Sequence, residues 1–319
     1  MSTIEARLAA PARRLTPEEL ASTWFVACAG LRVAGSGGLA TDWRFLGKLR
    51  GALGEVLRRS ASDDAIAGRP CPWSHPCGLD VLFRCQGHMT GALEIPKPLL
   101  ISADAVGGDL IVRIQLVGFA SDWLEEALAA MVLAVRERLR PLRGREIVDR
   151  SVHVFEAIET PRPADEVILR FITPLEIAFR NGAPAHPRDA IRSLILSMGN
   201  RVSGMARWQD AEIEADWKGI AEDAIGLDVS VLGETSDDWR RYSRRQQRWI
   251  PMSGDRPVLL LRGNLDRIAP LLALAQTIHA GRHASLGMGR FELLSSDEST
   301  IAPDRLAIPH SGLNATPVG

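Results

Sequence analysis

The sequence predicts an α+β protein built from two ferredoxin-like folds in tandem, each with the element order strand, helix, strand, strand, helix, strand. Three observations predict it. That order of periodic patterns occurs twice, Pro161-Arg-Pro163 separates the two occurrences, and 319 residues suit two domains. The expected parts are an N-terminal arm (1–20), an N-terminal domain (21–160), a C-terminal domain (161–295) and a flexible tail (296–319).

The first half begins with a strand-like segment, Thr23–Val33, and a segment in which apolar residues recur at helical spacing from Phe45 to Leu57. Residues 60–78 are rich in Pro, Gly, Ser and Cys, which predicts a loop. A short strand is then expected at Leu79–Cys85, and Asp109–Gly118 alternates apolar and polar residues as a half-buried strand does.

This half ends with a helix and a strand. Ser121-Asp122 is expected to cap a helix whose apolar stripe runs from Leu124 to Leu139. Arg145–Ala157 is the last strand expected there, which completes the first set of elements.

The second half repeats the order. Its expected elements are a strand at Val167–Ile177, a helix at Asp189–Met205, strands at Asp238–Ile250 and Pro257–Leu265 with a turn at Ser253-Gly254-Asp255, a helix at Ile268–Ile278 and a strand at Gly289–Leu294. The acidic region 207–236 is expected to be an insertion between helix and strand.

Composition is that of an ordinary soluble globular protein, with 46% hydrophobic and 24% charged residues. No apolar run of about 18 residues occurs, and the N-terminus lacks the pattern of a signal peptide. We therefore expect a cytoplasmic protein with no membrane partner. A net charge of −1 argues against a partner held by bulk positive charge, although a local basic patch can still attract phosphate.

The cysteines are Cys28, Cys71, Cys77 and Cys85. Three of them lie close together beside His75 and His88, but their C-x5-C-x7-C spacing is not a usual zinc-ligand spacing. We expect small buried residues in a turn-rich segment, and no metal or other cofactor. Zinc at Cys71, Cys77 and Cys85 remains the alternative.

Arginines are concentrated between Trp239 and Trp249, at Arg240, Arg241, Arg244, Arg245 and Arg248. Guanidinium groups pair with phosphates in a planar fork, and aromatic faces stack on bases. If this segment is a strand, alternation puts Arg240, Tyr242 and Arg244 on one side. The arginine bias of the chain also fits a GC-rich genome.

A glycine-rich segment follows, with Gly281, Gly287 and Gly289 among Arg282, His283 and Arg290. Glycines let a phosphate backbone approach main-chain N–H groups, and His279 and His283 can exchange protons near neutral pH. The two segments together predict an RNA site.

Motifs in both halves resemble those of the CRISPR-associated endoribonucleases that cut precursor CRISPR RNA, within the RAMP superfamily. The C-terminal motifs are Leu169-Arg-Phe-Ile-Thr-Pro174-Leu, Asp238-Trp-Arg-Arg-Tyr-Ser-Arg-Arg-Gln246, Leu261-Arg-Gly263-Asn-Leu, His279-Ala-Gly281-Arg282 and Leu286-Gly287-Met288-Gly289-Arg290. Looser matches are Leu49–Gly54, Cys71–Phe83 and Pro96-Lys-Pro98. The resemblance spans about residues 40–294.

The resemblance implies tandem RAMP-type folds, binding of CRISPR repeat RNA (hairpin or single-stranded), and metal-independent cleavage. In that reaction a ribose 2′-hydroxyl attacks the adjacent phosphate, which leaves 2′,3′-cyclic phosphate and 5′-hydroxyl ends. CRISPR effector-complex subunits and a second copy of the chain are further candidate partners. Many family members carry a catalytic histidine in or near the first helix, whereas residues 42–58 contain none and Lys48 is the only amine there.

The candidate catalytic residues are His283, His279, Tyr242 and Lys48. The candidate RNA-binding residues are Arg240, Arg241, Arg244, Arg245, Arg248, Gly281, Arg282, Gly287, Gly289 and Arg290. Structural alternatives are that His279 caps a helix, where the dipole favours its protonated form, that Tyr242 packs beside Trp239, and that Lys48 lies on a solvated face. Two other functions stay open: a non-catalytic RNA-binding subunit, and an interaction protein whose arginines meet an acidic protein.

Overall fold

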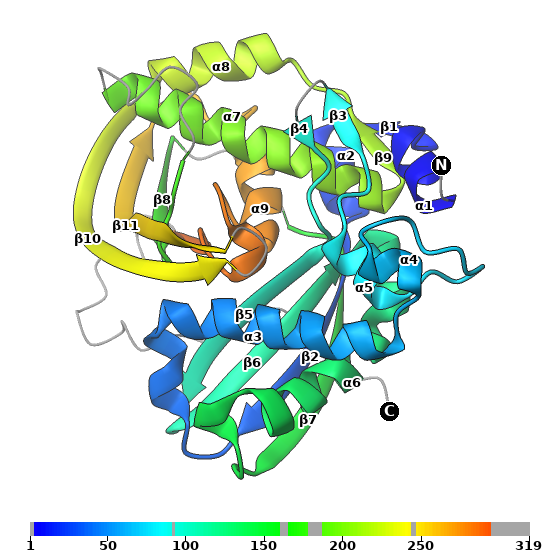
Figure 1. Cartoon of the computed structure of the whole chain (residues 1–319). Coiled ribbons are helices and arrows are strands. Elements are labelled where there is room, and N and C mark those ends of the chain that lie inside the picture. Colours follow the sequence, from blue (N-terminus) through cyan, green and yellow to red (C-terminus); the bar gives the residue numbers. More distant parts are fainter. Residues whose placement is uncertain (1–2, 91–92, 160–164, 178–186, 244–246, 295–319) are drawn as a thin grey trace.

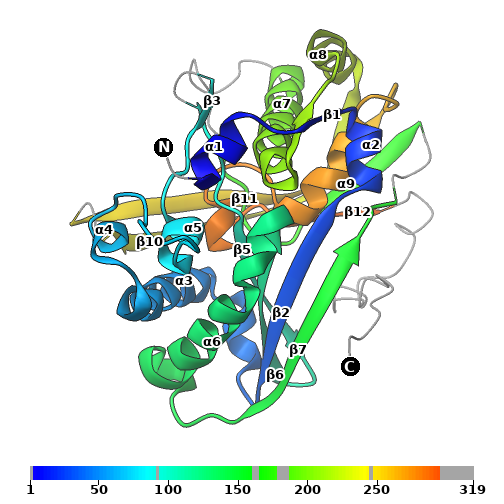
Figure 2. The ribbon, with the colours of Figure 1, turned by 90° about the vertical axis from the view of Figure 1, so that its right-hand side faces the viewer.

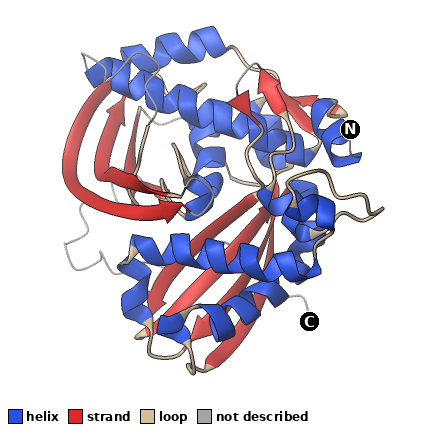
Figure 3. Ribbon diagram, viewed as in Figure 1, coloured by secondary structure: helices blue, strands red, loops and turns tan. Residues whose placement is uncertain are grey.

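The structure is a computed structural model that describes residues 3–90, 93–159, 165–177, 187–243 and 247–294, without the side chains of 187–189, 238, 241–243, 251 and 253. Two sheets with their helices lie one above the other (Figures 1 and 3). One continuous hydrophobic cluster runs through both halves, from Leu8 and Leu31 to Leu261 and Phe291. No helix in the described part of the chain has both the length and the apolar character needed to cross a bilayer.

The N-terminal fold contains β2 (Phe25–Val33), α3 (Trp43–Leu57), β5 (Leu99–Val106), β6 (Asp109–Val117), α6 (Leu124–Leu133) and β7 (Ile147–Glu156). The antiparallel sheet has the order β5-β6-β2-β7. The first strand is thus flanked by the third and fourth, which is the ferredoxin-like arrangement. Both helices lie on one side of this sheet (Figure 2).

The C-terminal fold repeats this topology with β8 (Glu166–Phe171), α7 (Pro187–Ala206), β10 (Asp228–Ser243), β11 (Arg248–Arg262), α9 (Ala269–Ile278) and β12 (Phe291–Leu294). The sheet order β10-β11-β8-β12 places first, third and fourth strands as in the N-terminal fold. Between α7 and β10 lie β9 (Ala211–Ile213) and α8 (Trp217–Gly226), where the acidic insertion was expected, although β10 already begins at Asp228. The predicted tandem ferredoxin-like fold is confirmed.

Periodic segments form the expected elements because one face of each is buried. In α3 the apolar residues that define the helical spacing, including Phe45, Leu49 and Leu53, are buried, and the Asp42 carboxylate accepts a hydrogen bond from the Arg44 amide at the helix start. In β6 the buried residues alternate with half-buried ones, as the pattern predicted. These two elements fix the N-terminal helix and sheet layers.

Two expectations in the N-terminal half are wrong. Leu79–Cys85 is not a strand, because α5 (Gly78–Phe83) forms there, and the second strand is β5. A short apolar run does not distinguish a buried strand from a buried helix. Ser121 does not cap α6 with its side chain, since its hydroxyl donates to the Gly118 carbonyl in the turn that precedes this helix.

The first residues are part of the fold and are not an arm. They form α1 (Thr3–Ala9), β1 (Arg13–Leu15) and α2 (Pro17–Ser22). Leu8 and Leu20 are fully buried, and β1 pairs in parallel with β9 of the C-terminal half. The segment therefore joins the two halves. The expected linker at residues 161–163 and the tail from residue 296 lie outside the described residues.

The hairpin of the second fold turns at a different place than predicted. β10 and β11 pair from Asp228 with Arg262 to Ser243 with Arg248, with one register shift between Val231 and Gly233, so Ser253-Gly254-Asp255 lies inside β11. A side chain at Gly254 would meet the Leu175 carbonyl at 2.8 Å, which gives this glycine a packing role. The correction moves the arginine cluster to the far end of a long hairpin.

Candidate nucleic-acid interface

A groove of about 2090 Å³ lies between α3 and the far end of the β10–β11 hairpin. Its lining carries nine cationic side chains against two carboxylates. The cations are Arg44, Lys48, Arg50, Arg58, Arg84, Lys97, Arg138, Arg140 and Arg240, and the carboxylates are Glu55 and Glu94. A concave surface with this excess of positive charge raises the local potential for phosphates in a chain whose net charge is near zero.

Some of these cations form ion pairs with carboxylates, and others do not. Arg84 forms ion pairs with Asp80 and Glu5, and Arg44 lies 2.9 Å from Asp42. By contrast, Lys48, Arg58 and Arg240 are exposed, and no carboxylate in the described part of the chain forms an ion pair with any of them. These last three charges can contact a phosphate at little cost in lost ion pairs.

Tryptophans from both folds line the same groove. Trp43 begins α3, and Trp239 and Trp249 lie on the two strands of the hairpin. Trp249 is 63% exposed, which is unusual for so large an apolar side chain. Trp239 is half-buried and packs on a small cluster of Met252, Leu286 and Met288. The cluster holds the hairpin against the glycine-rich segment, and Trp249 lies outside it.

The motifs that carry the resemblance meet in space. The Arg282 amide donates to the Glu176 carbonyl, and the Gly289 amide donates to the Pro174 carbonyl, at 2.8 and 2.9 Å. The Ala280 amide donates to the Gly289 carbonyl at 2.8 Å. The threonine-proline-leucine segment and the two glycine motifs thus form one hydrogen-bonded unit beside α3.

The glycine-rich segment packs closely against the protein's own backbone at Gly281, Gly287 and Gly289, and their contact with RNA stays a prediction. All three have positive φ, and Gly287 and Gly289 are buried. A Cβ would collide with the Glu176 carbonyl oxygen from Gly281 and with that of Ala280 from Gly289, and it would meet that of Ile101 at 2.8 Å from Gly287. The glycines are needed because the chain packs against itself there.

His279 lies in the core, contrary to its candidate role. It is 5% exposed and has a φ of 62° at the end of α9. Burial, followed by the nearby charges of Arg290 and Arg201, lowers the pKa of this imidazole to about 3. His279 is therefore neutral at physiological pH, and the expectation that the helix dipole favours its protonated form is wrong.

His283 and Arg282 face Glu176 and do not line the groove. The Arg282 guanidinium lies 2.9 Å from a Glu176 carboxylate oxygen, and His283 Nε2 lies 3.6 Å from the other. Arg290 donates to Asp104 at 2.7 Å and is also absent from the groove lining. These three residues are thus absent from the groove lining, whereas Lys48 is part of it.

The hairpin residues expected to bind RNA lie toward the far end of the β10–β11 hairpin. Tyr242 pairs with Trp249 in backbone register, and Arg240 pairs with Pro251 along the same two strands. Arg248 is exposed on β11. The side chains of Arg241 and Tyr242, and Arg244 and Arg245 altogether, lie outside the described residues.

Sequence reasoning missed the groove residues contributed by other segments. These are Trp43, Arg44, Lys97, Arg138 and Arg140. Arg136, Arg138 and Arg140 alternate just before Pro141, which was the available signal for a basic surface after α6. Cys71, Cys77 and Cys85 do not form one group, because the Cys77 amide contacts Cys71 Sγ at 3.5 Å whereas Cys85 lies with His88 and Glu94.

No protein-family model and no curated protein matches the chain. Among solved structures, it is similar to a Cas6 product complex, with 15% identity, coverage of 85% of this chain and 100% of the other, and a TM-score of 0.49. It is also similar to Cas6 from Thermus thermophilus, with 13% identity, 85% and 99% coverage and a TM-score of 0.47. A third similar structure is the CRISPR RNA processing endoribonuclease Cas6b, with 12% identity, 85% and 100% coverage and a TM-score of 0.41.

Proposed function

We propose that this chain is a CRISPR-associated endoribonuclease that binds repeat RNA in precursor CRISPR transcripts and cleaves it to make guide RNAs. The observation that carries the proposal is the groove between α3 and the hairpin, with nine cations, two carboxylates and three tryptophans in its lining. The motif resemblance supplies the kind of RNA. Because those motifs come together in space beside the groove, the groove and the resemblance support the same proposal.

In this proposal the groove holds RNA by its backbone and its bases. Lys48 on α3 and Arg58 at its C-terminal cap contact phosphates from one wall, and Arg240 on β10 contacts them from the opposite wall. Guanidinium groups bind phosphates in a bidentate manner, and an exposed indole stacks on any base. Trp249 is the stacking surface at the hairpin end.

The proposed chemistry is metal-independent attack of a ribose 2′-hydroxyl on the adjacent phosphate. It needs a base for the 2′-hydroxyl, a proton for the leaving 5′-oxygen, and positive charge on the phosphorane. Lys48 and Arg240 supply the charge in this proposal, and the Lys48 ammonium can also donate the proton. Tyr242, two residues after Arg240 on β10, is the candidate that positions the 2′-hydroxyl in this proposal.

One observation favours a second candidate, a non-catalytic RNA-binding subunit of a CRISPR ribonucleoprotein. No histidine lines the groove among the residues that the structure describes, and α3 contains none. Without an imidazole the groove retains the means to bind RNA but lacks the most common proton-transfer group.

The deciding experiment incubates an end-labelled repeat hairpin with the protein in EDTA at several salt concentrations. Cleavage with cyclic-phosphate ends supports the enzyme. Tight, salt-dependent binding without cleavage supports the subunit, because phosphate contacts release counterions. Absence of salt-dependent binding overturns both and leaves a protein–protein role for the arginines.

Two variants locate the activity. Lys48→Ala is expected to weaken binding and to reduce the salt slope by roughly 0.7–1, the value for one lost phosphate contact. Lys218→Ala, an exposed lysine on α8 that is not part of the groove lining, is the matched control and should change neither quantity. Equal effects of the two substitutions would show that the groove does not bind RNA.

His283→Ala tests whether a histidine outside the groove lining acts in cleavage.

A further inference from the structure

A second cluster of reactive side chains lies at the margin of the groove. Cys85 follows α5, His88 begins β3 (His88–Thr90), and Glu94 ends β4 (Leu93–Glu94). One thiol sulfur, one imidazole nitrogen and one carboxylate oxygen from these residues lie within 4.8 Å of one another. His88 and Glu94 are register partners across the β3–β4 ribbon, so the backbone itself places the two side chains together.

We propose that Cys85, His88 and Glu94 bind a zinc ion. Sulfur, nitrogen and carboxylate oxygen are the ligands that Zn²⁺ takes in proteins, at about 2.0–2.3 Å. Tetrahedral ligands at such bond lengths stand roughly 3.4–3.8 Å apart, so the side chains need to close by about 1 Å. Water completes the fourth position, since the described residues supply three ligands.

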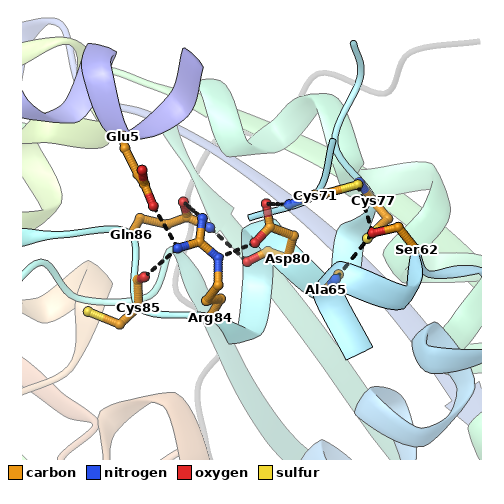
Figure 4. A network of polar contacts seen from close by, with 9 residues as sticks. All are labelled: Glu5, Ser62, Ala65, Cys71, Cys77, Asp80, Arg84, Cys85 and Gln86. Atoms are coloured by element: carbon orange, nitrogen blue, oxygen red, sulfur yellow. Dashed lines mark hydrogen bonds and ion pairs between the residues drawn. The ribbon is translucent and has the colours of Figure 1, made fainter. Parts of the chain in front are cut away.

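The thiol ligand is held in place by a polar network centred on Arg84 (Figure 4). The Arg84 guanidinium donates to the Cys85 carbonyl at 3.1 Å, to Gln86 at 2.8 Å and to Glu5 at 2.7 Å, and it also pairs with Asp80. These contacts fix the backbone at Cys85 against α1 and α5. A ligand with a fixed backbone loses less freedom when a metal binds.

The same network shows why the other cysteines are not ligands of this site. Cys71 and Cys77 are buried and contact each other through the Cys77 amide, on the far side of Asp80 (Figure 4). Ser62 also contacts Cys71 Sγ at 3.3 Å. In contrast Cys85 is partly exposed, and His88 and Glu94 are exposed, so an ion can reach all three.

The ribbon gives the ion a structural role. A ladder of two or three residues per strand is too short to be stable in water by itself. The ribbon lies near α7 of the second fold, because a Cβ on Gly204 would meet Met89 Sδ at 3.2 Å and Pro96 at closer range. A zinc ion that ties β3 and β4 to Cys85 would therefore also stabilise the contact between the two folds.

Binding requires two local changes. The Cys85 thiol, whose sulfur is 3.4 Å from the Gly87 carbonyl oxygen, loses its proton and binds as thiolate, so one proton is released per ion. Glu94, which is exposed, exchanges its contact with the half-buried Lys97, 3.9 Å away, for the metal. A partly exposed ion pair at this separation contributes little, so its loss does not oppose binding strongly.

The test uses the full chain stripped of metal. Zn²⁺ is titrated against a chromophoric chelator, and Co²⁺ is used to report thiolate ligation by its absorption band. One equivalent of Zn²⁺ should bind and raise Tm. Cys85→Ser should abolish the thiolate band and weaken binding by at least about 100-fold, since loss of even an outer partner costs roughly 10–100-fold.

Matched variants make the result decisive. His88→Ala changes an exposed residue, so it preserves the fold, and it should weaken Zn²⁺ binding as strongly as Cys85→Ser. Cys77→Ser should leave the cobalt band intact. Loss of the band in Cys77→Ser with retention in Cys85→Ser, or millimolar affinity in the unaltered chain, would overturn the proposal. The result does not bear on the proposed RNA cleavage, because that reaction is tested in EDTA and needs no metal ion.

Discussion

The Arg290 guanidinium donates a hydrogen bond to the Asp104 carboxylate at 2.7 Å, and this contact joins the residue before β12 of the second fold to β5 of the first. Asp104 is buried and also pairs with Arg113 on β6. The carboxylate therefore neutralises two arginines at the boundary between the folds.

Asp104→Ala should destabilise the protein by about 3–5 kcal/mol, because removal of one partner of a buried pair leaves uncompensated charge. Urea denaturation measures the loss. Glu222→Ala, which removes an exposed ion pair with Lys218, is the control and should change stability by no more than about 0.5 kcal/mol. Similar losses in the two variants would show that Asp104 is not the electrostatic link between the folds.

The buried imidazole of His279 predicts a loss of stability in acid. Burial lowers its pKa to about 3, whereas the unfolded chain takes up the proton near pH 6.5. The stabilisation from the neutral form is therefore complete above about pH 6.5 and falls as the pH drops toward 3. The slope from this residue is at most about 1.4 kcal/mol per pH unit.

His279→Gln should flatten the dependence of unfolding free energy on pH between about 6 and 4.5, relative to the unaltered chain. His88→Gln, at an exposed position and studied without metal, is the control that should keep the original slope. Parallel curves for all three proteins would show that His279 accepts a proton within the folded state.

Because Trp249 is largely exposed, its substitution should change the RNA affinity while leaving the free energy of unfolding almost unchanged. Trp249→Ala should weaken RNA affinity by about 1–3 kcal/mol, the usual contribution of one stacked base. Its unfolding free energy should shift by no more than about 0.5 kcal/mol, because the side chain is 63% exposed. Trp73→Ala, 49% exposed and absent from the groove lining, is the control for loss of an exposed tryptophan. Unchanged affinity in Trp249→Ala would exclude stacking at this position.

Gly289→Ala should reduce stability, and any effect on RNA should follow from that. The residue has a φ of 67°, and a Cβ would collide with the Ala280 carbonyl. A loss of more than about 1 kcal/mol is expected where both strain and overlap occur. Gly226→Ala, where a Cβ has open space, is the control. Weaker RNA binding with unchanged stability would restore the idea that the phosphate backbone approaches this glycine.

Periodicity predicted the architecture because it reports one buried face per element. The segments around Leu49 and Leu116 have such a face and were assigned correctly. The Leu79–Phe83 run is too short for any period to emerge, and it forms a helix. Ser253-Gly254-Asp255 has the composition of a turn, but Gly254 is small because the Leu175 carbonyl lies against it.

The site was predicted only in part, since proximity between distant segments leaves no local pattern. The arginines and tryptophans of the hairpin and the exposed cations of α3 were each visible in the sequence. Nothing local indicates that Lys48 and Arg240 line one groove, or that Arg138 and Arg140 join them. The glycines of residues 281–289 were singled out correctly, but their close contacts are with the protein's own carbonyls.

The β10–β11 hairpin has a mechanical consequence. β11 pairs with β8 over Val258–Arg262 and forms one further bridge, between Asp255 and Leu175, so the segment from Arg248 to Ser253 extends past the rest of the sheet. Its outer support is the small cluster of Met252, Leu286 and Met288. A polyanion that contacts both Arg240 on the hairpin and Lys48 on the opposite fold would link the two folds, so its binding would restrict their motion relative to each other.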